Sequence, residues 1–196
     1  MLIHEDTKHI GLTEIKKEKI VMVKVCVNAG HHPKYDSGAV GMYSREADIV
    51  KFVAEVVCED LRKVGIDALF VQEDNLAEIC NKSNEYGADL FVSIHCNSAV
   101  NKKAEGTETF YYKGSHHSQL LAECVQHQLV DTMESVDRGI KEGNKLYVLR
   151  RTVAPAILTE LGFISNAREE KYLNEHKKVM AHAIARGITD YLNVIM

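Results

Sequence analysis

Apolar residues follow two different patterns along the chain. In some segments they form short continuous runs, which are typical of strands buried in a parallel sheet, and in others they recur every three or four positions, as on one face of a helix. The strands predicted in this way are residues 21–28, 66–71, 90–94, 106–112, 146–149 and 156–160. The predicted helices are residues 44–64, 75–86 and 115–133, with the closing helices within residues 167–192. This alternation predicts one α/β domain, with a twisted, mostly parallel sheet of about six strands and helices on both faces.

Residue types that begin and end helices mark the boundaries of the first two helices. Ser44 precedes the first long helix and is a residue type that caps helix N-termini. Gly65 and Gly87 follow the first and second helices, and glycine commonly ends a helix in the left-handed conformation.

The start of the chain follows neither pattern. Residues 1–20 are polar and weakly periodic, so we expect an N-terminal tail there, either disordered or not native to the protein. A short helix or an edge strand is the alternative. Met22 lies at the start of the first apolar run and could serve as the natural start. The globular domain is therefore expected over residues 21–196.

Composition excludes several classes of protein. The chain of 196 residues has 24 Lys and Arg against 28 Asp and Glu and no basic stripe, which argues against binding to nucleic acid. Its five cysteines show no paired spacing, which argues against both a disulfide scaffold and a structural zinc ribbon. We find no signal peptide and no apolar run long enough to span a membrane, and therefore expect synthesis in the cytoplasm without an export route of its own. The sequence leaves the oligomeric state open.

Three of the apolar runs end in a residue that can bind or serve a metal ion. The first run leads into Gly30 and His31, the third into His95, and the last into Glu160. The carboxyl ends of parallel strands meet at one edge of the sheet, where open α/β sheets bind their ligands. We therefore expect these side chains to lie close together.

Glu46 is a fourth candidate because of its place on the first long helix. It lies four, seven and eleven residues before Val50, Val53 and Val57, on the same apolar stripe. A carboxylate that faces the core needs a partner, and a metal ion is one such partner. The alternative is a glutamate of the first helical turn, favoured by the helix dipole and directed to water.

Each of the other candidates has an ordinary structural alternative. His31 could be a surface histidine of a loop, and His95 could be bonded to a loop carbonyl. Glu160 could form a buried ion pair with Arg150 or Arg151, or its apolar surroundings could raise its pKa, as suits a general base. Taken together, two histidines and two carboxylates at one predicted edge are the components of a hydrolytic zinc site.

The motifs around these residues resemble those of a known family. The resemblance covers residues 25–31, 36–41, Glu46, 92–99, 106–109, 138–140, 146–150 and 155–166. In this combination and order they resemble the zinc-dependent N-acetylmuramoyl-L-alanine amidases of the type-3 amidase family, from about Met22 to the C-terminus.

The resemblance implies a site and a reaction. His31, Glu46 and His95 would ligate one Zn2+ ion, and Glu160 would be the catalytic carboxylate. The reaction would be cleavage of the amide that joins the lactyl group of N-acetylmuramic acid to L-alanine in peptidoglycan. We name Asn97 and Arg151 as candidate substrate-binding residues. The absence of a signal peptide would fit a phage lysin, or a sporulation or autolytic enzyme, that acts on the cell wall after release.

The sequence departs from the family pattern at two positions. Asn28 stands where the family usually has aspartate, and His32 stands where it usually has glycine. If the family's aspartate braces the histidine ligand, Asn28 would provide no charge and zinc would bind more weakly. The interval between His95 and Glu160 leaves no room for the blocking helix of some members, so the site is expected to be open.

Two other functions remain alternatives. A zinc peptidase or deacetylase would act on a different amide, but the order of the motifs disfavours it. A peptidoglycan-binding module without catalysis would lack a ligand or the base, and none is missing.

Overall fold

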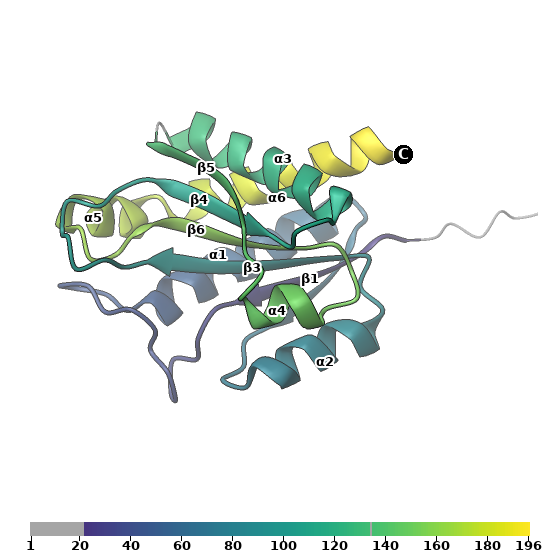
Figure 1. Cartoon of the computed structure of the whole chain (residues 1–196), viewed down its shortest axis with the longest axis horizontal. Helices are drawn as coiled ribbons and strands as arrows, with labels where there is room; N and C mark the ends of the chain where they lie inside the picture. The colour runs from purple at the N-terminus through teal and green to yellow at the C-terminus, as the bar shows by residue number, and fades with distance from the viewer. Residues whose placement is uncertain (1–21, 134) are drawn as a thin grey trace, which may run out of the picture.

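The computed structural model describes residues 22–133 and 135–196, and within them six strands form one sheet in the order β2-β1-β3-β6-β4-β5. The strands are β1 (Lys24–Ala29), β2 (Asp67–Val71), β3 (Leu90–Asn97), β4 (Thr107–Tyr111), β5 (Asp137–Glu142) and β6 (Ala156–Phe163). Four of them, β2, β1, β3 and β6, are mutually parallel. Strand β4 runs antiparallel to β6, and β5 is parallel to β4. The prediction of a mostly parallel sheet is confirmed (Figure 1).

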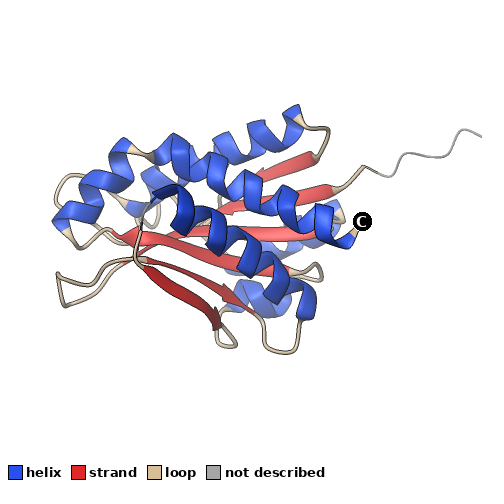
Figure 2. Cartoon of the chain, turned by 90° about the horizontal axis from the view of Figure 1, so that it is seen from above, coloured by secondary structure: helices blue, strands red, loops and turns tan. Residues whose placement is uncertain are grey.

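Helices cover both faces of the sheet. On one face lie α1 (Glu46–Lys63), α3 (His116–Met133) and α6 (Lys177–Ile195), which share the larger apolar core with the strands. The helices α3 and α6 lie side by side on that face (Figure 2). On the other face α2 (Leu76–Tyr86) and the short α4 (Tyr147–Arg151) pack over a smaller core. Helix α5 (Ala167–Glu175) follows β6 and leads into α6.

The prediction of a strand over residues 146–149, the fifth in chain order, is wrong. Residues 146–149 belong to the start of α4, where Val148 and Leu149 are buried in the smaller core. A short apolar run does not by itself distinguish a strand from a buried helical turn. The actual fifth strand is β5, an edge strand whose side chains are mostly polar and partly exposed, so no apolar pattern revealed it.

The start of α1 also differs from the prediction. The helix begins at Glu46 with Arg45 in the N-cap position, and Ser44 makes no capping bond. The Ser44 hydroxyl instead donates to Glu170 at the start of α5 (2.8 Å). The predicted helix ends are confirmed, because Gly65 and Gly87 both adopt positive φ angles, of 83° and 68°.

Three further expectations concern the N-terminal tail, the cysteines and membrane-spanning segments. The predicted tail over residues 1–20 lies outside the described residues. All five cysteines are free thiols. No helix in the described part of the chain is long and apolar enough to cross a membrane.

Candidate metal centre and active site

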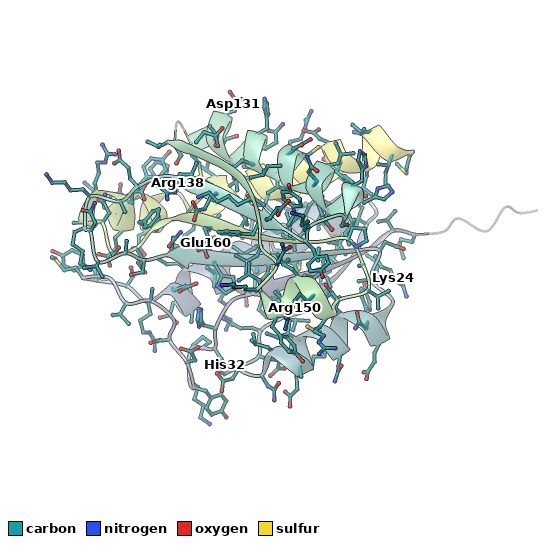
Figure 3. All side chains as sticks on the ribbon, in the orientation of Figure 1. Lys24, His32, Asp131, Arg138, Arg150 and Glu160 are labelled. Atoms are coloured by element: carbon teal, nitrogen blue, oxygen red, sulfur yellow. The ribbon has the colours of Figure 1, made fainter. Side chains whose placement is uncertain are left out.

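The candidate residues meet at the carboxyl edge of the parallel strands. His31 follows β1, His95 lies near the end of β3, and Glu46 is the first residue of α1. The pairing of β3 with β6 places Glu160 directly beside His95. Figure 3 shows Glu160 toward this end of the sheet, with Lys24, at the start of β1, at the other.

Three of these side chains converge on one point. Oε2 of Glu46 lies 3.4 Å from Nε2 of His31, and its Oε1 lies 2.9 Å from Nδ1 of His95. One potential ligand atom from each residue lies within 4.8 Å of the others. Two imidazole nitrogens and one carboxylate oxygen are a donor set used by catalytic zinc sites, so these residues fit a zinc ion.

Glu46 is held in place by the backbone around it. It is 3% exposed, and its carboxylate accepts hydrogen bonds from the backbone N–H groups of Ala39 (2.9 Å) and Cys96 (3.0 Å). Burial acts to raise its pKa, but the hydrogen bond to His95 and the charges of both histidines outweigh this, so the pKa lies below its usual value. The prediction that Glu46 faces the core is confirmed, and the alternative of a water-facing glutamate is excluded.

His31 is oriented by a residue that sequence reasoning missed. Its Nδ1 lies 2.6 Å from Oδ2 of Asp36, whose Oδ1 accepts from the N–H of Gly38 (3.0 Å). The bond with His31 is the largest of the effects that lower the pKa of Asp36. Asn28 makes no such contact, because its amide bonds Ser93, Ala29 and Val71 instead. Asp36 was visible in the sequence only as part of the family-like segment 36–41.

Two glycines make room for the histidine rings. A Cβ atom at Gly30 would lie 2.2 Å from Cε1 of His95, which no real contact allows. A Cβ atom at Gly38 would lie 2.6 Å from Cδ2 of His31 and 2.7 Å from Oε2 of Glu46. Any larger residue at either position would push a candidate ligand out of the cluster.

Beside this cluster, Glu160 has a carboxylate oxygen without a hydrogen-bond partner among the described residues. Its Oε2 is buried and has no hydrogen-bond partner among the described residues, and no ion pair joins it to Arg150 or Arg151. Burial raises the pKa of Glu160 to about 7, with His95 opposing the shift and Glu46 adding to it. A carboxyl group with a free oxygen and a pKa near neutrality can take up a proton from a water molecule held at the cluster.

A family model described as N-acetylmuramoyl-L-alanine amidase matches residues 25–190, a span that includes His31, Glu46, His95 and Glu160. The chain belongs to this family. The prediction made from the motifs is confirmed, and the chain is an amidase of a family that acts on peptidoglycan.

Relatives and solved structures agree with this assignment. The chain is 40% identical over 176 residues to YqiI, an uncharacterized protein of Bacillus subtilis, covering 85% of this chain and 84% of the relative. It is 36% identical over 181 residues to an uncharacterized cell wall amidase of Bacillus anthracis, covering 82% of this chain but only 34% of that protein, about a third of its length. The catalytic domain of CwlV, an N-acetylmuramoyl-L-alanine amidase from Bacillus (Paenibacillus) polymyxa var. colistinus, superposes with a TM-score of 0.81 at 34% identity, covering 88% of this chain and 99% of that domain.

The remaining candidate residues of the amidase lie at different places. Asn97 is two residues beyond His95 on β3 and donates to Glu108 of β4 (2.8 Å), so it lies beside the cluster. The structure does not bring Arg151 there. Arg151 ends α4, and its carbonyl accepts from the side chain of Asn84 near the end of α2 (3.0 Å).

His32 does not join the candidate metal cluster. Its ring stacks on Tyr35, with the centroids 4.8 Å apart, and its Nδ1 accepts from the N–H of Lys34 (3.2 Å). The two consecutive histidines therefore have different surroundings.

Proposed function

We propose that the amidase hydrolyses the amide between the lactyl group of N-acetylmuramic acid and L-alanine in peptidoglycan, and that it does so with one bound zinc ion. The observation that carries this proposal is the position of Glu160. Its unpartnered carboxylate oxygen lies in strand register with His95, beside a cluster whose donor set fits zinc.

His31, Glu46 and His95 would hold the ion. Three protein ligands leave a position open for water or substrate, as in catalytic zinc sites. When bound, zinc would polarise the amide carbonyl and lower the pKa of water at the site.

The chain's own residues would carry out the rest of the reaction. Glu160 accepts a proton from the attacking water and returns it to the leaving nitrogen of L-alanine, so one carboxylate serves as base and then as acid. Asp36 keeps the ring of His31 in a fixed orientation and tautomer, which is the role of a carboxylate behind a histidine ligand. The backbone bonds to Glu46 hold the third ligand.

We also propose that the enzyme acts in cell-wall lysis, as a phage lysin or as a sporulation or autolytic enzyme that reaches the wall after release from the cytoplasm. This role would need no activation step, because the candidate metal cluster is open to solvent. The side chains of His31 and His95 are 29% and 20% exposed. The helices between His95 and Glu160, α3 and α4, bury their side chains in the two apolar cores rather than over the cluster.

Digestion of purified peptidoglycan tests the proposed reaction. We expect new L-alanine amino termini and free lactyl carboxylates, with no release of single amino acids or acetate. A peptidase would expose other amino termini, a deacetylase would release acetate, and a binding module would release nothing. Removal of metal with a chelator should abolish the digestion, and added zinc should restore it.

A further inference from the structure

A second charged cluster lies next to Glu160 on the same face of the sheet. The antiparallel pairing of β4 with β6 places Glu108 directly beside Glu160. Glu108 is buried and accepts hydrogen bonds from Nε of Arg138 (2.7 Å), Nζ of Lys141 and Nδ2 of Asn97 (2.8 Å). Burial acts to raise its pKa, but the bonds with Lys141 and Arg138 lower it below the usual value. Two cations therefore share one ionised carboxylate, and the cluster keeps one net positive charge.

Arg138 is fixed in position and still has donors to spare. Its guanidinium lies over the ring of Phe163 (4.9 Å to the centroid), and its Nη1 donates to the carbonyl of Glu105 (3.3 Å). Within the described part of the chain, Nη2 of Arg138 donates to no protein acceptor, and the ammonium of Lys141 donates to one, Glu108. The two side chains are 34% and 39% exposed, so a ligand can reach the remaining donors.

The distance between Glu160 and the basic pair Arg138 and Lys141 suits a peptide substrate. His95, Glu160 and Glu108 are neighbours across β3, β6 and β4, and adjacent strands lie about 4.8 Å apart. The basic pair on β5 is therefore about 5–10 Å beyond Glu160, and Figure 3 shows Arg138 at the same end of the sheet as Glu160. An extended peptide advances about 3.3–3.6 Å per residue. The second or third residue after the scissile amide would reach this pair.

We propose that Arg138 and Lys141 form a carboxylate-binding subsite for the stem peptide of peptidoglycan. The subsite would bind the free carboxylate of the second or third residue on the leaving-amine side, an inference that rests on the proposed function. A guanidinium held rigid by its own contacts binds a carboxylate with little further loss of freedom. The sugar residues that carry the lactyl group have hydroxyl and acetamido groups without charge, so they would not use this subsite.

The subsite fixes the direction of the substrate across the site. The peptide would run from the cluster over β6 toward β4 and β5. The muramic acid ring would lie on the opposite side, toward the loop that follows β1. Replacing the free carboxylate by an amide would then weaken binding, because the amide keeps the shape and removes the charge.

The test uses two soluble muramoyl peptides that differ only in whether this carboxylate is free or amidated. For the wild-type holoenzyme we expect a kcat/KM about 10-fold higher for the free acid, mostly through KM, because a charged pair is worth more than a neutral hydrogen bond. The double variant R138Q/K141Q should treat the two substrates alike, and each single variant should show an intermediate preference. The matched control K113Q removes a lysine that pairs with Glu142 (3.2 Å) and should keep the full preference.

Binding of the same two peptides separates this proposal from the proposed function. Calorimetry on the zinc-loaded E160Q variant, with and without R138Q/K141Q, requires no turnover. Tighter binding of the free acid that disappears with R138Q/K141Q supports the subsite, even if neither peptide is cleaved by the wild type. Equal binding of both peptides by E160Q, or a preference that survives the double substitution, overturns it. The single variants, which leave one cation on Glu108, serve if the double variant does not fold.

Discussion

At the scale of single residues, the two consecutive histidines after β1 have different surroundings. His31 has a φ angle of 59°, a left-handed conformation that costs a residue with a side chain about 1 kcal/mol and is enriched at functional sites. That conformation turns its ring toward Glu46, while His32 stacks on Tyr35. Of the two histidines, only His31 belongs to the candidate metal cluster of the described residues.

The pair H31A and H32A tests this assignment by metal content. We expect H31A to lose stoichiometric zinc and cell-wall digestion, because it removes one of three protein ligands. H32A should keep one zinc ion per chain, since the ring of His32 contacts Lys34 and Tyr35 of its own loop. Equal loss of zinc in the two variants would show that the ligand is assigned wrongly.

The contact between Asp36 and His31 predicts an effect on metal affinity. D36N keeps the shape of the side chain and removes the charge behind His31, so we expect zinc affinity to fall about 10- to 100-fold, as for other second-layer carboxylates. Competition for zinc with a chromogenic chelator measures this affinity. The control D48N alters an exposed aspartate that pairs with Arg45 (2.7 Å). An affinity of D36N equal to that of the wild type would refute the bracing role.

At the scale of elements, α5 fixes the segment between β1 and α1. The buried carboxylate of Glu170 accepts from the backbone N–H groups of Met42 (2.8 Å), Tyr43 (2.7 Å) and Ser44 (2.8 Å). This segment follows Asp36 and Gly38, which lie against the candidate ligand His31. A helix at the far end of the sequence thereby supports the loop that shapes the site.

The Glu170 contacts predict a stability difference that depends on pH. Burial acts to raise the pKa of Glu170, but the N–H groups of Tyr43, Met42 and Ser44 outweigh it and the pKa lies below its usual value. The ionised carboxylate therefore stabilises the fold above the unfolded-chain pKa of about 4.3, and this is lost as the pH falls through the lower folded-state pKa.

We expect E170Q to lower the free energy of unfolding by about 2 kcal/mol at pH 7, because bonds to a charged acceptor are replaced by weaker ones. Urea unfolding of both proteins at pH 7 and near pH 3 measures the difference, which should narrow at the lower pH. The control E175Q removes a surface pair with Lys171 (3.9 Å) and should change little at either pH. A difference that does not depend on pH would contradict the electrostatic explanation.

At the scale of the whole molecule, the sequence predicted those elements and site residues that are determined by local sequence patterns. The buried strands and the amphipathic α1 were predicted because their apolar periodicity is strong, and the four central site residues because they stand at the ends of such elements. β5 was missed because it is a polar edge strand, and α4 because its apolar run is too short to show a period. The roles of Glu170 and of Glu108 with Arg138 depend on contacts between distant segments, which no local pattern contains.

The described residues contain a six-stranded sheet and the candidate metal cluster. We therefore expect a chain that begins at Met22 to match the full chain in melting temperature and in the rate of peptidoglycan digestion. Thermal unfolding by circular dichroism and a turbidity assay on cell walls measure the two properties. A large drop in either would mean that residues 1–21 contribute to the fold or to the site.

The most direct test of the central claim is the zinc content and turnover of E160Q. Glutamine keeps the shape of the buried side chain and removes the proton acceptor. The proposed mechanism predicts one zinc ion per chain, as in the wild type, with turnover reduced about 100- to 10,000-fold, the range of general acid–base catalysis. Near-normal digestion of peptidoglycan by E160Q would contradict the mechanism. Loss of zinc would instead make Glu160 a ligand and leave Glu46 as the candidate base.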